Sequence, residues 1–404
     1  MRKLVSVKRV TDIQPIPDAD LIVVATVDGG WNCVVKKGEF NIGDLGVYFE
    51  IDSFLPVIPE FEFLRKSSFK KMGDKEGFRL KTVRLKGTIS QGLLIPYNMV
   101  KTILKDKEDI HFEHGEDLTE ALGVEKYEQP IPACISGEVV GDFPSFIPKT
   151  DQERIQNLYL DYSKTYADNS DLIIEELSKN IEKYANRIEE LKNNRKPNPI
   201  LDLEFEATIK LDGTSMTVFV VDANVYKTRN IEKLKEELGD NFDTTYFGVC
   251  GRNYELREKE GNTYWDVANR DIKEKLINFY KETGRNIALQ GELMGVGIQG
   301  NREKLDKHQF FCYEIWDIDK QRYLVKKERE EILVKLNIQS VPFIENIKVF
   351  KVFKTLDDIL KYAEGHSINH PIREGVVFKS NELVNGRTVS FKAISNLFLL
   401  KGGD

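Results

Sequence analysis

The chain lacks several features that define whole classes of protein. It has no run of about 18 apolar residues, so no membrane-spanning helix is predicted. Its first stretch, MRKLVSVKRVTDIQPIPDAD, contains no apolar segment of a signal peptide. Four scattered cysteines, Cys33, Cys134, Cys250 and Cys312, form no CxxC pair, which argues against a zinc ribbon and a disulfide framework. These absences predict a protein of the reducing cytoplasm.

Two common nucleotide-binding motifs are also missing. No GxxxxGK[ST] segment occurs, so a P-loop is excluded. The segment GVGIQG at 295–300 matches GxGxxG, but only NREKLDKH separates it from the next predicted strand, which is too short for the crossover helix of a Rossmann unit. The five histidines form no HExxH or other tight cluster, so a histidine-based metal site is not expected.

Charge is present but unevenly distributed. The net charge of −7 argues against a general binder of polyanions. Nevertheless, residues 64–86 contain nine Lys or Arg against two acidic residues, whereas residues 105–128 contain nine acidic residues against three Lys. A local basic stretch can bind phosphates, and the alternative is a solvated loop rich in lysine.

A length of 404 residues predicts two domains. Residues 1 to about 100 contain short apolar runs separated by Gly-rich turns, a pattern typical of a small β barrel or sandwich. The stretch PDADLIVVATVDGGWNCVVKKGEFNIGDLGVYFEID resembles the OB-fold domains that bind tRNA and other nucleic acids. We therefore expect an all-β OB-fold nucleic-acid-binding domain with an acidic connector over 1–128.

Two helical segments are predicted in the middle of the chain. The stretch 141–157 reads as a loop leading into a helix, with Thr150 as its N-cap. Residues 170–192 carry an apolar stripe with the a/d spacing of about three heptads, which predicts either contact with a partner helix or a dimer, or an amphipathic helix packed on its own protein. We expect this helix to form an insertion near 163–198. The stripe consists of Ile174, Leu177, Ile181, Tyr184, Ile188 and Leu191.

From residue 201 onward, strands and helices alternate in a pattern typical of an α+β domain with mostly antiparallel strands. The segment TIKLDGTSMTVF predicts a hairpin, because Asp212-Gly213 is a favoured two-residue turn between strand formers. Lys210 precedes this turn between apolar neighbours. It is either a solvated strand residue or a nucleophile at the edge of a pocket.

Further charged residues lie in predicted strands rich in Val, Ile and Phe. A single one would be ordinary, because strands carry a polar face. Several are harder to dismiss, because charges in apolar strands are costly to bury unless they pair or bind a ligand. These residues are Arg252, Glu292, Asp317, Glu374 and Lys392.

Together with Lys210, these residues resemble the ordered motifs of the covalent nucleotidyltransferases, the superfamily of polynucleotide ligases and mRNA capping enzymes. KLDGTS matches the KxDG nucleophile motif, and the OB-like domain ahead of it is similar to one branch, the RNA ligases whose OB domain precedes the catalytic domain. The resemblance implies an ATP-grasp-like ligase domain of antiparallel sheets with flanking helices over 129–404. The later motifs follow in order as Arg252, GEL with Glu292, the aromatic–acid pair Trp316-Asp317, REGVVFK with Glu374, and Lys392.

The resemblance also implies roles for residues. Lys210 would attack the α-phosphate of ATP to form lysyl-AMP, which requires a lowered pKa, and Lys392 would neutralise charge on that phosphate. Glu292 and Glu374 would bind Mg²⁺ or Mn²⁺. Trp316 would stack on adenine. The implied catalytic set is Lys210, Glu374, Lys392 and Asp317, and the implied cofactor-binding set is Ile209, Asp212, Gly213, Arg252, Glu292, Trp316 and Lys379.

The implied function is an ATP-dependent RNA ligase that joins 3′-OH and 5′-phosphate ends, with RNA or RNA-containing duplex ends as partners and no membrane. The alternatives are a capping-type guanylyltransferase, a DNA ligase or a catalytically inactive RNA-binding homologue. One departure concerns Ser390, which stands where several relatives have a lysine. A second cation could then come from Lys379 or Arg387.

Overall fold

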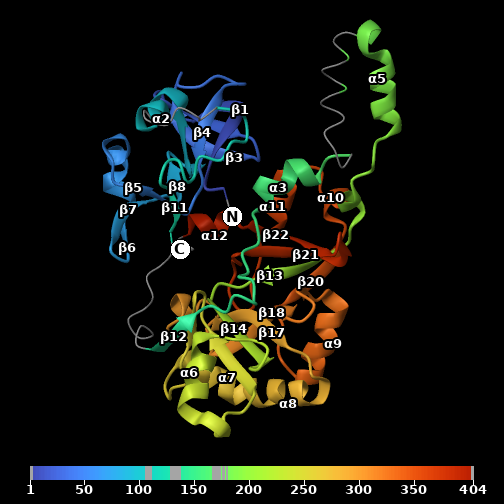
Figure 1. Cartoon of the computed structure of the whole chain (residues 1–404). Helices are drawn as coiled ribbons and strands as arrows, with labels where there is room; N and C mark the ends of the chain where they lie inside the picture. The colour runs from blue at the N-terminus through green and yellow to red at the C-terminus, as the bar shows by residue number, and fades with distance from the viewer. Residues whose placement is uncertain are drawn as a thin grey trace. The chain divides into compact units, whose positions relative to one another are not determined.

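The computed structural model describes residues 3–104, 112–127, 138–165, 174, 178 and 181–401, with the side chains of 181–184 left aside. The chain divides into two compact units (Figure 1). One consists of Met1–Pro132 together with Leu399–Asp404, and the other of Ala133–Phe398. The sequence did not indicate that the last residues belong to the first unit.

The first unit is an OB-fold built on a five-stranded antiparallel sheet in the order β10-β4-β1-β2-β3. The hairpin between β2 and β3 turns at Gly29 and Gly30, whose φ angles of 85° and 74° suit glycine. Alternating side chains of these strands fill the core, where Trp31 and Tyr48 are fully buried. The strands are β1 (Val5–Pro15), β2 (Ile22–Val27), β3 (Trp31–Lys36), β4 (Leu45–Phe49) and β10 (Leu93–Pro96).

A second, four-stranded sheet and a separate hairpin complete the strands described in this unit. The sheet has the order β11-β5-β7-β6, and the hairpin pairs β8 with β9 through a turn at Lys86 and Gly87, both with positive φ. The elements are β5 (Ser53–Pro56), β6 (Phe69–Met72), β7 (Lys75–Arg79), β8 (Thr82–Leu85), β9 (Thr88–Gln91), β11 (Glu125–Lys126), η1 (Pro59–Leu64), α1 (Arg65–Ser68) and α2 (Tyr97–Ile103).

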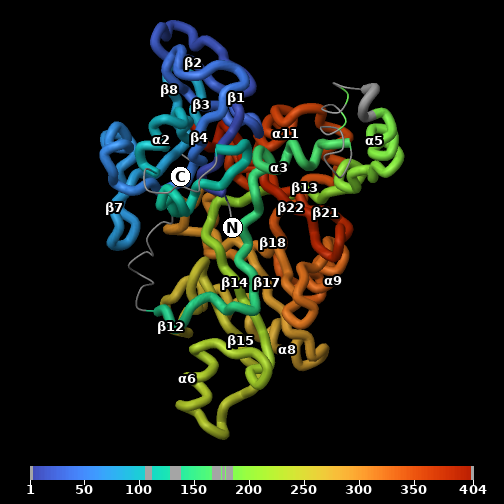
Figure 2. Tube along the Cα trace, turned by 45° about the horizontal axis from the view of Figure 1, so that its top comes forward, coloured from blue at the N-terminus to red at the C-terminus, as the bar shows by residue number. Residues whose placement is uncertain are grey.

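The second unit contains a seven-stranded antiparallel sheet in the order β12-β16-β15-β14-β17-β18-β19. One face of its central strands is apolar and packs on α7, α8 and α9 in a shared core. Figure 2 shows β14 and β17 side by side. The strands are β12 (Val139–Asp142), β14 (Thr214–Asp222), β15 (Thr245–Cys250), β16 (Tyr254–Leu256), β17 (Ile287–Met294), β18 (Gln309–Asp317) and β19 (Arg322–Tyr323).

A four-stranded antiparallel sheet, in the order β20-β13-β21-β22, forms the rest of the second unit's strand framework. Its strands are β13 (Phe205–Lys210), β20 (Phe343–Ile347), β21 (Gly375–Val384) and β22 (Arg387–Ile394). The expected α+β domain with antiparallel strands is confirmed. The helices are α3 (Ile155–Tyr162), α5 (Ile181–Asn193), α6 (Arg229–Leu238), α7 (Thr263–Asp271), α8 (Lys273–Thr283), α9 (Lys326–Leu336), α10 (Val349–Val352), α11 (Leu356–Tyr362) and α12 (Asn396–Leu400), with short turns η3 (Pro199–Asp202), η4 (Gly239–Asn241) and η5 (Gln299–Asn301).

Only part of the predicted heptad helix falls within the described residues. Helix α5 covers its second half, and Ile174 and Ile188 are buried. The remaining residues of 166–180 lie outside the described part of the chain, and helix-mediated contact with a partner stays a prediction. Among the residues that are described, no helix combines the length and apolarity needed to span a bilayer.

One face of the four-stranded sheet depends on a cluster of aromatic rings around Phe391. This residue is fully buried, and its ring lies 5.1 Å from that of Phe378 and 5.4 Å from that of Phe205. We expect Phe391→Ala to lower the free energy of unfolding by about 3–5 kcal/mol. Urea denaturation followed by tryptophan fluorescence measures this. Leu383→Ala, on the exposed part of the neighbouring strand β21, is the control and should cost less than about 1 kcal/mol; equal losses would contradict this role for the aromatic cluster.

Candidate active site

The four-stranded sheet has one apolar and one polar face. Side chains alternate along each strand, and cross-strand partners share a face. Register pairs Lys210 with Gly375, which in turn pairs with Ile394, while Lys392 pairs with Val377 and Lys379 with Ser390. Lys210, Lys379 and Lys392 therefore share the polar face, and the opposite face packs in the aromatic core.

The chain passes from one sheet to the other directly after Lys210. Strand β13 belongs to the four-stranded sheet and β14 to the seven-stranded sheet, so the hairpin predicted at Asp212-Gly213 is wrong. Gly213 has no positive φ; it is required because a Cβ there would lie 2.6 Å from the Leu293 carbonyl and 2.8 Å from Glu292. This close approach brings the nucleophile motif against the end of β17.

Lys210 forms an ion pair with Glu374, with Nζ donating to Oε2 at 2.6 Å. Burial lowers the pKa of Lys210, but the surrounding carboxylates, Glu374 first, raise it by more, so that the pKa lies above the usual lysine range. These carboxylates act against the lowered pKa that attack on ATP would require. Lys210 is an ammonium here and must lose a proton before it can act as a nucleophile.

Glu292 lies beside this pair at the end of β17. Its Oε1 accepts a hydrogen bond from the Gly213 N–H at 3.1 Å. Burial raises the pKa of the Glu292 carboxyl to about 7, against the lowering effect of Lys210. Glu292, Glu374 and Asp212 thus bring three carboxylates around Lys210, as the electrostatic interactions among them show.

Lys392 is held by the segment that precedes α3. Its Nζ donates to Asp151 Oδ1 at 3.1 Å, and its backbone N–H donates to the Glu153 carbonyl at 2.9 Å. Thr150 is not the N-cap that the sequence suggested: Arg154 occupies that position, and the Thr150 hydroxyl hydrogen bonds to the Tyr313 hydroxyl at 2.9 Å. The segment therefore lines the site as well as leading into a helix.

Below these residues lies a buried network of four charges, which we call the buried ion network. Lys379 Nζ contacts Glu314 Oε1 at 3.0 Å, and Arg329 of α9 pairs with Glu206 and also lies 3.7 Å from Glu314. These side chains are at most 7% exposed, whereas Lys210 retains 26% and Glu374 15% exposure. Solvent therefore reaches the Lys210–Glu374 pair but not the buried ion network.

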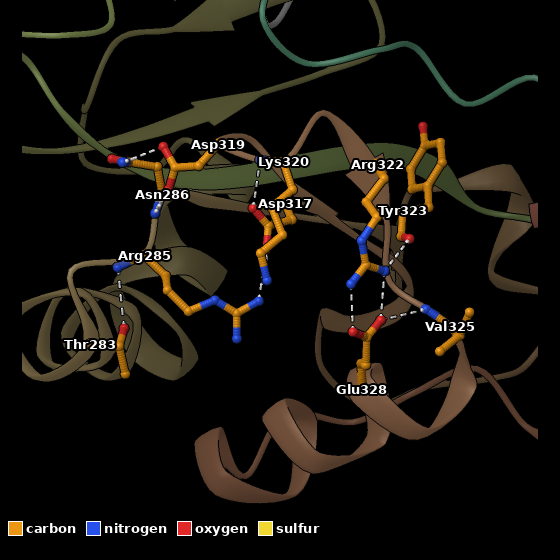
Figure 3. Close-up of polar contacts among 10 residues, drawn as sticks. All are labelled: Thr283, Arg285, Asn286, Asp317, Asp319, Lys320, Arg322, Tyr323, Val325 and Glu328. Carbon is orange, nitrogen blue, oxygen red and sulfur yellow. Dashed lines mark hydrogen bonds and ion pairs between the residues drawn. The ribbon is translucent and has the colours of Figure 1, made fainter. Parts of the chain in front are cut away.

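The structure does not bring Trp316 and Asp317 to this cluster. Trp316 pairs with Ala288, four residues from Glu292 along β17, or about 13 Å. Its Nε1 donates to the Phe146 carbonyl, and its ring packs on Tyr323. Asp317 is buried and accepts hydrogen bonds from Arg285 and from the Lys320 N–H at 2.9 and 3.0 Å (Figure 3). Neither residue is described in contact with Lys210, Glu374 or Glu292, and the roles that the resemblance implies for Trp316 and Asp317 stay predictions.

The remaining predicted residues have varied positions. Arg252 is exposed and lies in the bend between β15 and β16, two residues after Cys250, which pairs with Thr217 of β14. Ile209 donates its N–H to the Pro342 carbonyl at 2.9 Å. Asp212 lies 3.8 Å from Arg302.

Sequence reasoning missed Asp151, Arg302 and Tyr313. Tyr313 is half-buried beside Glu292, and burial raises the pKa of its hydroxyl well above the usual value, with Glu292 adding to this. The sequence signal that could have indicated Tyr313 was an aromatic residue three positions before Trp316 in the same strand. Asp151 and Arg302 lie in loops without periodicity, so no pattern marked them.

Comparison with known proteins identifies the family. A family model described as an OB-fold domain matches residues 4–97, and one described as RNA ligase matches residues 203–394. An RNA ligase structure from Naegleria gruberi with PPi is 37% identical over 100% of both chains, with a TM-score of 0.74. The chain is a member of the RNA ligase family.

Other structures of the Naegleria gruberi enzyme agree with this membership. The two family models together place the chain in the branch with an N-terminal OB-fold. A mutant with ATP and Mn is 38% identical over 100% of both chains, with a TM-score of 0.74. Another mutant, with AMP and Mn, is also 38% identical over 100% of both chains, with the same TM-score. Comparison with curated proteins finds no match.

The ion pair with Glu374 predicts that this carboxylate raises the pKa of Lys210. A lysine with a raised pKa contributes stability that is fully present below its ordinary value of 10.5 and is lost as the pH rises through the folded-state value. Glu374→Gln removes the first attractive charge, so the neutral fraction of Lys210 at pH 8 should increase several-fold. The rate of labelling of Lys210 by an amine-directed reagent, followed by peptide mass spectrometry, should increase accordingly.

Glu382→Gln, an exposed carboxylate on the same strand β21, is the matched control and should leave the labelling rate unchanged. An unchanged rate in Glu374→Gln would show that Glu374 does not set the protonation of Lys210.

Proposed function

We propose that this chain is an ATP-dependent RNA ligase that works through a lysyl-AMP intermediate on Lys210. The observation that supports it most directly is the Lys210–Glu374 pair: a lysine held at 2.6 Å by a carboxylate, partly open to solvent, with Glu292 and Asp212 around it. Such a pair fixes the position of Nζ, and the lysine must lose its proton before it attacks a phosphorus atom. The structures of the related enzyme with ATP and Mn support the choice of nucleotide and metal.

The first step forms one bond and breaks one. Lys210 loses a proton, its Nζ bonds to the α-phosphorus of ATP, and the bond to the bridging oxygen breaks with release of pyrophosphate. Lys392, on the same polar face, would exchange Asp151 for the α-phosphate and stabilise the charge that develops there.

Carboxylates at the site fit a hard divalent cation. Glu292 and Glu374 would hold Mg²⁺ or Mn²⁺. The described residues contain no ready group of three metal ligands, so phosphate and water oxygens would complete the coordination. When bound, the metal supplies positive charge that favours neutral Lys210 and offsets the charge of the triphosphate.

Trp316 would stack on the adenine base, as the motif implies, and Tyr313, which interacts electrostatically with Glu292, is a second aromatic side chain that we expect near the base. Lys379 is occupied by Glu314 and the Tyr313 carbonyl in the buried ion network. Lys379 is the cross-strand partner of Ser390, which stands where several relatives have a lysine. Lys379 can replace that missing cation only if ligand binding breaks its contact with Glu314.

The later steps transfer AMP to a 5′-phosphate end, after which a 3′-OH displaces AMP and seals the strand. Nicks in duplex RNA or RNA–DNA hybrids are the expected substrates. In the first unit, several basic residues of 65–86 already form ion pairs: Arg65 with Glu62, Lys71 with Glu76, and Lys75 with Glu125. Among the described residues, no ion pair is found for the exposed Lys66, Lys70, Arg84 and Lys86, so these carry the available charge.

The first test incubates the protein with Mg²⁺ and α-labelled ATP, or GTP in parallel, and follows label that survives denaturation. We expect label from ATP in the wild type and a loss of about 1000-fold or more in Lys210→Ala, because no other nucleophile replaces the amine. Label from GTP alone would favour a capping-type guanylyltransferase. No label, with intact mass excluding bound AMP, would favour an inactive RNA-binding protein.

A second test separates nucleic-acid binding from nucleotide chemistry. Replacing Lys66, Lys70, Arg84 and Lys86 with Ala should weaken sealing of a nicked RNA duplex about 10-fold or more at 0.15 M salt, and flatten its salt dependence by roughly 0.7–0.9 in slope for each phosphate that the protein no longer neutralises. Self-adenylylation should not change. The control replaces Lys71 and Lys75, whose charges are paired, and should have a smaller effect; equal losses in sealing and self-adenylylation would contradict the assignment.

A further inference from the structure

The loop between β17 and β18 adopts a strained conformation next to the nucleophile. Three of its non-glycine residues, Gln299, Asn301 and Lys304, have φ angles of 43°, 47° and 52°. Asn301 fixes the loop by exchanging hydrogen bonds of 3.0 Å with the backbone of Leu305. Strain of this kind persists where the surrounding structure enforces it, and it is concentrated at functional sites.

Glu303 anchors the same loop to the segment that leads into Glu374. Its carboxylate accepts from the Asn369 N–H at 2.6 Å, and its carbonyl accepts from the Asn369 side chain at 3.0 Å. The loop is therefore held at two points, on either side of Arg302 in sequence. These two anchors fix the backbone on both sides of Arg302.

Arg302 lies between the two segments that carry the reacting pair. Its Nε is 3.8 Å from Asp212 Oδ2, two residues after Lys210, and its Nη2 is 3.5 Å from the carbonyl of Ile372, two residues before Glu374. The guanidinium lies over the ring of Phe398, 4.6 Å from its centre, which fixes the plane of the group. Its side chain remains 20% exposed.

The contacts of Arg302 within the described residues are all long. Its interactions with Asp212, His370 and Ile372 measure 3.5 Å or more. By contrast, Arg373 shows what a structural arginine does here: it caps α11 with hydrogen bonds of 2.5–3.0 Å to three carbonyls. The guanidinium of Arg302 therefore has a fixed orientation, but its N–H donors make only long contacts with the described residues.

We propose that Arg302 binds a phosphate group next to Lys210, an inference that rests on the proposed ligase function. A planar guanidinium with weakly used donors fits two oxygens of a phosphate and would exchange its long contact with Asp212 for short charge-assisted hydrogen bonds. The phosphate comes either from the triphosphate of ATP or from the 5′-phosphate of the RNA strand. The chemistry is the same, and the experiment separates the two sources.

The test uses Arg302→Gln and Arg302→Lys in the full chain. In the first arm, ATP binding with Mg²⁺ is measured by equilibrium dialysis in the Lys210→Ala background, where no chemistry is needed. In the second, enzyme already carrying AMP is mixed with a 5′-phosphate nick in the absence of ATP, and AMP transfer and sealing are followed. Lys307→Gln removes an exposed charge from the same loop and is the control.

If Arg302 binds the triphosphate, the first arm weakens about 10-fold or more in Arg302→Gln and the second stays within twofold; if it binds the RNA phosphate, the pattern reverses. Arg302→Lys should recover part of the loss, because it keeps the charge without the fork. Changes within twofold in both arms overturn the proposal. So does an equal loss in both arms with a lower melting temperature, which indicates a structural role. If the wild type takes no label from ATP, the proposed ligase function is wrong. The dialysis arm would still test whether Arg302 binds the triphosphate of ATP.

Discussion

Four buried charges join the two sheets of the second unit. Lys379 of β21 meets Glu314 of β18, while Arg329 of α9 reaches both Glu314 and Glu206 of β13. The charges balance, and removing one partner from such a pair costs about 3–5 kcal/mol, because the other is left buried without compensation. Replacing the whole network with apolar residues would be less costly. We interpret the buried ion network as a means of fixing the positions of β13 and β21 against β18. Strand β13 ends at Lys210, and β21 begins directly after Glu374.

The charged side chains of the second unit differ in exposure between the buried ion network and the residues around Lys210. The residues of the network are inaccessible, whereas Lys210, Glu374 and Asp212 retain access to solvent. The difference has an electrostatic consequence. Carboxylates around Lys210 favour its ammonium form, and a divalent metal ion held by these carboxylates would favour the neutral amine.

Much of this arrangement could be predicted from the order of short motifs. Lys210, Glu292 and Glu374 were found because each stands in a compact pattern within an apolar strand, and the structure brings all three together. Strand and turn spacing predicted a small β barrel or sandwich and an α+β unit, and the resemblance of the N-terminal stretch implied the OB-fold. The family membership that the motifs implied is shown by the comparisons.

The failures have physical causes. The hairpin at Asp212-Gly213 was inferred from local turn chemistry, but the pairing partners of β13 lie far along the chain in β20 and β21. Trp316, which the motif order implies as an adenine contact, pairs with Ala288 and packs on Tyr323, and its role stays a prediction. Arg302 and Asp151 lie in loops, where no periodicity exists to mark them. Lys210 was expected to be poised as an amine, and local sequence carries no information on which carboxylates surround it.

The protonated state of Lys210 also bears on chemical selectivity. A neutral lysine exposed at the surface of a rigid site would react with any electrophile in solution, including aldehydes and acyl phosphates. Here the ion pair with Glu374 favours the protonated, unreactive form of Nζ. In the proposed mechanism, this ion pair would protect Lys210 from other electrophiles and couple its reactivity to the binding of a metal ion and ATP.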